Sequence, residues 1–157
     1  MKVLFVCMGN ICRSPTAQGV FEVLLEKEGL SDRVAVDSAG TGPWHVGKQP
    51  DSRAQEAAAK RGYRLDRQRA RQVKVEDFSR FDLILPMDKD NLAELSKICP
   101  DSERHKVKLF LSYANDSDFL EVPDPYYGGQ NGFELVLDLI EDAGSGLLRQ
   151  IQQKLPK

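Results

Sequence analysis

Cysteine, histidine and tryptophan are scarce in this chain of 157 residues, which contains three, two and one of them. An odd, small number of cysteines does not indicate a disulfide framework, so we expect a reducing compartment. Cys7 and Cys12 have no matching second pair, and His45 and His105 are far apart in the sequence, which argues against a zinc site. We therefore expect no bound metal.

Long apolar runs and basic blocks are also missing. No stretch is long enough to span a bilayer or to serve as a signal peptide, so we expect a cytoplasmic protein without membrane contact. The net charge of −2 and the mixing of the arginines at 61–71 with acidic residues argue against a nucleic-acid partner. We find no linker, repeat or low-complexity segment, and predict one domain, 1–157. We expect a monomer, with weak self-association left open.

The N-terminal segment 3–17, VLFVCMGNICRSPTA, carries the strongest signals in the chain. Residues 3–6 form an apolar run typical of a strand buried on both faces, and Cys7 stands where that run ends. Gly9 and Asn10 tolerate positive φ, so the backbone after Cys7 can turn tightly and direct several N–H groups into one concavity. The segment predicts a strand followed at once by a tight loop.

A helix is predicted to begin at Ser14-Pro15, because serine suits the N-cap and proline suits the first helical position. Loop amides and the positive end of the helix dipole then converge on one anion site. Arg13 can hold two oxygens of a phosphate, while the same field favours the thiolate of Cys7 beneath the bound oxyanion. An isolated Cys-x5-Arg pair is usually inert, but the flanking signals favour a phosphate site. Its predicted contacts are Met8, Gly9, Asn10, Ile11, Cys12 and Ser14.

Signals for strands and helices alternate along the rest of the chain. We predict strands at 3–6, 34–39, 81–87 and 107–111, and helices at 14–29, at 51–60, from 88 or 90 to 98, and from 131 or 132 onwards. This alternation predicts an α/β fold with a four-stranded, parallel, twisted sheet, helices on both faces and flavodoxin-like layering.

One rim of this sheet gathers the chemistry, because ligands of parallel sheets bind beyond the carboxyl ends of the strands. Cys7, residues 40–44, Asp88 and Asp124 each follow a predicted strand. If Cys7 attacks phosphorus, the leaving oxygen needs a proton, and Asp124 is the best candidate acid because flanking prolines restrict its backbone. The alternative, an Asp-Pro pair that only opens a turn, stays open at this point.

Four segments together resemble the low-molecular-weight protein tyrosine phosphatases, and the likeness covers essentially the whole chain: CMGNICRSP, DSAGTGPWHVG, FDLILPMDKDN and VPDPYYGG. The resemblance implies a phosphotyrosine phosphatase I-like fold and hydrolysis of tyrosine-phosphorylated proteins and small aryl phosphates without a cofactor. By resemblance, Cys7 is the nucleophile that becomes a cysteinyl-phosphate and Arg13 is the oxyanion clamp. Asp124 is the general acid and then the base.

The resemblance also implies a network that supports the loop. Asn10, Ser14 and Ser38 match residues that hydrogen-bond one another and keep Asn10 in its left-handed conformation. Where some members carry a histidine in this network, the sequence has Gln68, which can still donate and accept.

Substrate recognition is implied for two aromatic residues, Trp44 and Tyr126, which match walls that flank a phenyl ring. Met8 and Ile11 would point from the loop towards the same ring. Trp44 taken alone would be assigned to core packing, but its irregular, glycine-rich surroundings favour a place on the rim.

Cys12 has two interpretations that are compatible: a small buried apolar residue, or the partner of Cys7 in a reversible disulfide that protects the nucleophile. Two alternative functions remain. A thiol-dependent arsenate reductase needs a further cysteine pair, and only Cys99 lies outside the loop. The other is a non-catalytic phosphate-binding module, although by resemblance every residue required for turnover is present.

Overall fold

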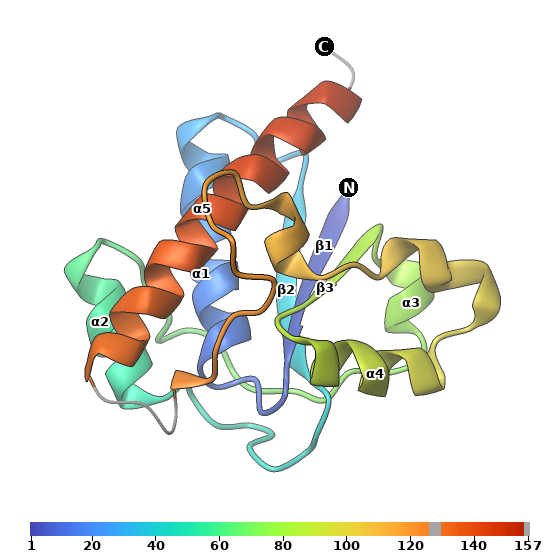
Figure 1. The fold of residues 1–157 in the computed structure, drawn as a ribbon, viewed down its shortest axis with the longest axis horizontal. Coiled ribbons are helices and arrows are strands. Elements are labelled where there is room, and N and C mark those ends of the chain that lie inside the picture. Colours follow the sequence, from blue (N-terminus) through green and yellow to red (C-terminus); the bar gives the residue numbers. More distant parts are fainter. Residues whose placement is uncertain (126–129, 156–157) are drawn as a thin grey trace.

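The centre of the fold is a parallel three-stranded sheet with the order β2-β1-β3. The structure is a computed structural model that describes residues 1–125 and 130–155. The strands are β1 (Lys2–Cys7), β2 (Ala35–Gly40) and β3 (Leu83–Pro86). Their register places Cys7 beside Gly40 and Val6 beside Pro86, so the carboxyl ends of all three strands share one edge (Figure 1). The α/β fold is confirmed.

Helices cover both faces of this sheet (Figure 1). The helical elements are α1 (Arg13–Lys27), α2 (Ser52–Lys60), α3 (Asp77–Arg80), α4 (Lys89–Ile98), the 3-10 turns η1 (Asp101–Lys106) and η2 (Phe110–Tyr113), and α5 (Gln130–Lys154). Helices α1, α2 and α5 contribute to one apolar cluster and α3 and α4 to the other. Within the described residues, no helix has the length and apolarity needed to cross a membrane.

Strand β1 separates the two clusters because its side chains alternate between the faces of the sheet. Phe5 lies in the α1 and α5 cluster, where its ring centroid is 5.9 Å from that of Phe21 and 4.9 Å from that of Phe110. Leu4 and Val6 lie in the cluster with α3 and α4. The prediction of a first strand buried on both faces is therefore confirmed.

The predicted fourth strand at 107–111 is wrong. In the described residues this segment makes only one isolated parallel bridge, between Val107 and Ile84, and then turns into η2. Val107 packs on the α3 and α4 side, whereas Phe110 is buried against Phe5 on the opposite side. The ladder cannot continue beyond Ile84 on this side, because β3 ends at Pro86, which has no N–H to donate. The Leu109 carbonyl accepts instead from the amide and hydroxyl of Ser112, at 3.0 and 2.7 Å, which closes the turn of η2.

At two of the three predicted helix starts, the side chain of the N-cap residue accepts hydrogen bonds from amides of the first turn. Asp51 accepts from two amides of α2 and Asp88 accepts from the Asn91 amide of α4. The predicted N-cap Ser14 is wrong, because α1 begins one residue earlier, at Arg13, and its N-cap Cys12 makes no side-chain cap. The Ser14 hydroxyl is used elsewhere, in the site described below.

Candidate active site

The loop between β1 and α1 is held from outside through its carbonyl groups. The Met8 carbonyl accepts from the Gly42 amide at 3.0 Å, and the Ile11 carbonyl accepts from the Asp51 amide at 2.8 Å. Because these carbonyls are satisfied on the outside, the N–H groups of the loop are left for the concave side.

Four loop amides have no acceptor in the part of the chain that the structure describes, namely those of Met8, Gly9, Ile11 and Cys12. The end of β2 approaches this loop so closely that a Cβ atom at Gly40 would lie 2.8 Å from the Met8 carbonyl oxygen. Only glycine permits this approach. The loop and the N-terminus of α1 together form an anion-binding concavity.

Asn10 keeps the loop tight in an uncommon conformation, with φ of 58°. Its side chain is 2% exposed and fully used. The Nδ2 group donates to Ser14 Oγ at 2.8 Å and to Ser38 Oγ at 3.0 Å, and Oδ1 accepts from the Arg71 amide at 3.0 Å. These bonds compensate for the cost of a left-handed residue other than glycine.

Cys7 is buried at the base of the concavity, with 3% of its surface exposed. Its Sγ lies 3.0 Å from Ser14 Oγ and accepts from the Asn10 amide at 3.3 Å. The hydroxyl of Ser14 has one proton, and its other acceptor, the Ala39 carbonyl, lies farther away at 3.4 Å. This geometry suits donation of the Ser14 proton to a thiolate at Cys7.

Ser38 anchors Asn10 to the interior of the fold. Its hydroxyl donates to Gln18 Oε1 at 2.7 Å, and Gln68 Oε1 lies 3.4 Å away. Gln68 also donates to the Pro15 carbonyl at 2.9 Å, so the residue that replaces histidine does join the network. Sequence reasoning missed Gln18, which has the shorter contact, because a glutamine inside a helix carries no local signal.

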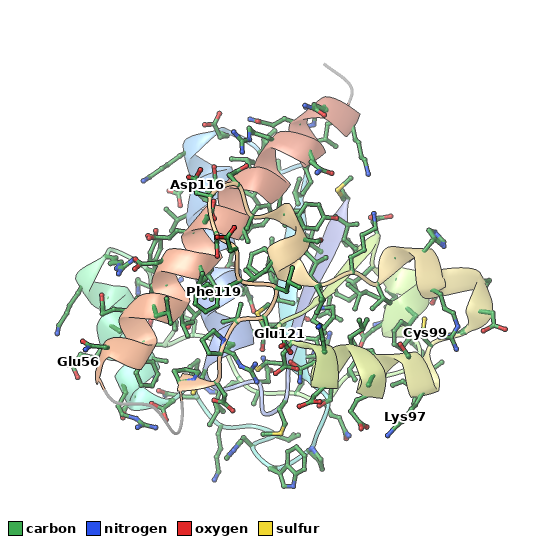
Figure 2. The ribbon with its side chains drawn as sticks, viewed as in Figure 1. Glu56, Lys97, Cys99, Asp116, Phe119 and Glu121 are labelled. Carbon is green, nitrogen blue, oxygen red and sulfur yellow. The ribbon has the colours of Figure 1, made fainter. Side chains whose placement is uncertain are left out.

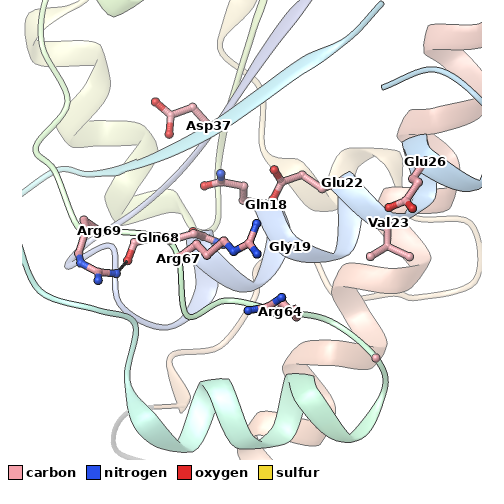
Figure 3. A pocket seen from close by; sticks show the side chains of 11 residues that line it. Gln18, Gly19, Glu22, Val23, Glu26, Asp37, Arg64, Arg67, Gln68 and Arg69 are labelled. Carbon is pink, nitrogen blue, oxygen red and sulfur yellow. Dashed lines mark hydrogen bonds between the residues drawn. The ribbon is translucent and has the colours of Figure 1, made fainter. Parts of the chain in front are cut away.

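A pocket of about 610 Å³ lies behind this network, between α1 and the segment 62–69 (Figure 3). Gln18 and Gln68 belong to its wall, together with charged side chains such as Glu22 and Arg67. Cys7 is not among the residues that line this pocket. The pocket is therefore not the candidate active site, despite its volume.

Arg13 is a charged side chain with only 3% of its surface exposed. Nη1 donates to Asp88 Oδ2 at 2.6 Å and to the Val122 carbonyl at 2.9 Å. Nη2 lies 3.8 Å from Asp124 Oδ2, and neither Nη2 nor Nε makes a hydrogen bond to the described residues. One arm of the guanidinium is therefore fixed by the protein, and the remaining donors can face an oxyanion.

The charge of Arg13 is secured by its neighbours. Burial disfavours the charged form, but the Cys7 sulfur and the Asp88 carboxylate outweigh it and raise the pKa of Arg13. Sequence reasoning placed Asp88 on the rim without a role. Its position directly after a buried strand was the available signal, but the contact with Arg13 spans 75 residues.

Asp124 lies on a segment that is anchored through both backbone groups of Val122. The Val122 amide donates to the Met87 carbonyl at 2.8 Å, directly beyond β3, and the Val122 carbonyl accepts from Arg13. Asp124 therefore lies on the predicted rim although no fourth strand precedes it. Cys7, Arg13 and Asp124 are brought together around one concavity.

Trp44 lies on the rim with 63% of its surface exposed. Its ring covers Gly42, where a Cβ atom would lie only 1.7 Å from a ring carbon, so only glycine allows this position. Met8 is 41% exposed and Ile11 is half-buried. Tyr126, the second predicted wall, lies outside the described residues.

Cys12 is buried, with 5% of its surface exposed, and forms no disulfide. Burial, and then the Asp51 carboxylate, raise the pKa of the Cys12 thiol. A thiol that stays protonated is a slow nucleophile. The protective disulfide with Cys7 stays a prediction.

The chain is similar to known proteins over its full length. A family model described as low molecular weight phosphotyrosine protein phosphatase matches residues 2–157. A low molecular weight protein-tyrosine-phosphatase from Streptomyces coelicolor is 45% identical over 157 residues, which are 98% of this chain and 95% of that protein.

Two solved structures show the same fold. The protein tyrosine phosphatase from Entamoeba histolytica, with Hepes in its active site, has a TM-score of 0.95 at 42% identity, covering 98% of this chain and 97% of that one. An arginine phosphatase from Drosophila has a TM-score of 0.90 at 34% identity, covering 99% of this chain and 100% of that one.

Proposed function

Because the chain belongs to the low molecular weight phosphotyrosine protein phosphatase family, we propose that it hydrolyses phosphotyrosine in proteins, and small aryl phosphates, through a cysteinyl-phosphate. One observation supports this above all others. The buried sulfur of Cys7 lies in a concavity with unpartnered amides, and the buried guanidinium of Arg13 stands at the end of the same loop.

In the first step, the Cys7 thiolate attacks phosphorus and the bond to the phenolic oxygen breaks. Asp124 transfers its proton to that oxygen, so tyrosine leaves as a neutral phenol. The loop amides and Arg13 hold the three remaining phosphoryl oxygens, where negative charge is concentrated in the transition state. Ser14 donates to the sulfur and stabilises it as a thiolate before attack.

In the second step, Asp124 acts as a carboxylate and removes a proton from water, whose oxygen attacks the phosphorus of the cysteinyl-phosphate. The sulfur–phosphorus bond breaks, inorganic phosphate is released and the Cys7 thiolate is restored. Asp124 ends the cycle protonated, ready for the next substrate, so protons balance over the two steps.

Protein substrates fit the open rim of the site, with Trp44, and by resemblance Tyr126, as walls for the phenyl ring. We place this activity in the cytoplasm and assign it to a monomer, with weak self-association left open.

The arsenate reductase alternative is disfavoured by the position of Cys99. That residue is 6% exposed and belongs to the apolar cluster with Leu4 and Val6, whereas Cys7 belongs to the cluster on the other face of the sheet. A thiol there cannot exchange with Cys7 without disrupting the core. A silent phosphate-binding module is disfavoured because Asp124 lies at the site.

A second substrate class has one observation in its favour, the likeness to the Drosophila arginine phosphatase. Phosphoarginine and phosphotyrosine present the same phosphoryl group to the loop and differ in the leaving atom and in the stem. The exposed indole of Trp44 favours the flat phenyl ring.

The decisive experiment is Cys7→Ser, with turnover of p-nitrophenyl phosphate, a phosphotyrosine peptide and phosphoarginine measured in parallel. We expect no turnover by the variant and retained binding of inorganic phosphate by calorimetry, because the loop amides and Arg13 remain. Cys99→Ser is the matched control and should keep full activity without added thiol. Turnover by Cys7→Ser would refute the mechanism, and faster hydrolysis of phosphoarginine by the wild type would reassign the substrate.

A further inference from the structure

Two large apolar side chains stand in solvent beside the candidate active site. Phe119 and Leu120 are 49% and 60% exposed, and they lie on the segment between η2 and α5 (Figure 2). Asp124 follows a few residues later on the same segment. Adjacent exposed side chains of this size next to a reaction centre are more typical of a contact surface than of a random surface position.

These side chains border a pocket of about 320 Å³, formed by residues 119–124 and Asp88. Asp88 and Asp124 also contact Arg13, at 2.6 and 3.8 Å. The pocket and the phosphate site therefore share a wall, so one peptide can occupy both. Its volume suits a single large side chain.

The segment that carries the pocket is held at defined points. The Val122 amide and carbonyl are bonded to Met87 and Arg13, and Glu121 Oε2 accepts from the Lys89 amide at 2.8 Å. The pocket is thus fixed relative to the reaction centre, and a preformed site loses little entropy on binding.

The charge of the lining is one-sided. Among the described residues, the lining includes the acidic residues Asp88, Glu121 and Asp124 and no lysine or arginine. Asp88 is paired with Arg13, and Asp124 carries a proton when substrate binds in the proposed mechanism, so Glu121 supplies the unpaired negative charge of the lining. An acidic side chain would be repelled there, whereas an aliphatic side chain would contact Phe119 and Leu120 and displace water.

We propose that this pocket is a substrate subsite for a large aliphatic residue close to the phosphotyrosine, and that it rejects an acidic residue at that position. The inference rests on the proposed phosphatase function, and it narrows the substrates to phosphotyrosine sites with such a neighbour.

The test uses phosphotyrosine hexapeptides in which one residue, leucine, glutamine or glutamate, is moved through the positions flanking the phosphotyrosine. At one position we expect kcat/KM to be about 3- to 10-fold higher for the leucine peptide than for the glutamine peptide. This is the effect expected if binding removes roughly half of the leucine side chain from water. The glutamate peptide should be slower than the glutamine peptide.

Phe119→Ser and Leu120→Ser should each reduce the preference for leucine and leave hydrolysis of p-nitrophenyl phosphate unchanged. Ile98→Ser, at the far end of α4 with 42% exposure, is the matched control and should keep the preference. Equal rates for leucine and glutamine at every position, or a preference that survives both pocket variants, would overturn the subsite. If the wild-type protein did not hydrolyse p-nitrophenyl phosphate at all, the phosphatase assignment itself would be refuted.

Discussion

The phosphate loop and the rim around it are built in opposite ways, although they meet at Arg13. Cys7, Asn10 and Arg13 are 3% exposed or less. Each is hydrogen-bonded to a distant part of the chain: the Cys7 carbonyl to the Thr41 amide, Asn10 to Ser38, and Arg13 to the Val122 carbonyl. On the rim, Trp44 is 63% exposed and Leu120 is 60% exposed.

This difference separates two tasks. The chemical step needs donors and charges that do not reorganise during the reaction, which requires burial and fully used side chains. Recognition of a protein surface needs apolar groups that are still in water before binding. Substitutions in the loop should therefore affect every substrate, whereas substitutions on the rim should affect only substrates that reach it.

After the loss of turnover expected for Cys7→Ser, the largest effect is expected at Asp124, the rim residue that lies 3.8 Å from Arg13. Asp124→Ala should lower kcat for a phosphotyrosine peptide by about 10²- to 10⁴-fold, because phenolate is a poor leaving group without a proton. The loss should be smaller for p-nitrophenyl phosphate, whose nitrophenolate leaves more readily. Asp118→Ala, an exposed carboxylate on the same segment, is the control. Equal losses for both substrates would exclude Asp124 as the acid.

A smaller, substrate-independent effect is expected at Ser38, which acts through Asn10. Ser38→Ala removes the acceptor of an Asn10 hydrogen bond that is worth about 0.5–1.5 kcal/mol, so kcat should fall by roughly 2- to 13-fold for all substrates. Weaker binding of inorganic phosphate should accompany the loss, which a purely structural role would not produce. Ser96→Ala, whose hydroxyl bonds within its own helix, should change neither. A loss confined to one substrate would contradict a role in positioning the loop.

An effect of similar size, but confined to KM and to aryl substrates, is expected for Trp44. Trp44→Ala should raise KM for aryl phosphates by about 2- to 13-fold with little change in kcat, because stacking on a ring contributes about 0.5–1.5 kcal/mol. Small alkyl phosphates should be unaffected, and Val46→Ala, with 57% exposure in the same loop, should change neither class. A large fall in kcat would place Trp44 with the buried loop and break the distinction between the two regions.

Local signals in the sequence predicted the elements that depend on neighbouring residues alone. The strand, turn and helix around Cys7 were predicted from apolar residues, Asn10 and the Ser-Pro pair, and Asp51 and Asp88 lie at helix starts as expected. These features depend on backbone preferences and on bonds across a few residues, so a short window contains their cause.

Tertiary structure decided the features that depend on distant partners. Residues 107–111 have the composition of a strand, but their neighbour β3 ends at Pro86, which has no N–H to continue the ladder, and the chain turns into η2. Ser14 is a residue type that favours N-cap positions, but its hydroxyl is hydrogen-bonded to Cys7 and Asn10 instead of to the helix. Hydrogen bonds to specific partners compete with local preferences, and which partners are within reach depends on the folded chain.

The phosphate loop shows both contributions in one segment. Its residue types and spacing by themselves predict a nucleophile beneath an anion site. The support of that site by Asp88 and Gln18 was not predicted, because their contacts with Arg13 and Ser38 span 75 and 20 residues. The sequence therefore determines the chemistry of the loop, whereas the fold determines the side chains that hold it in place.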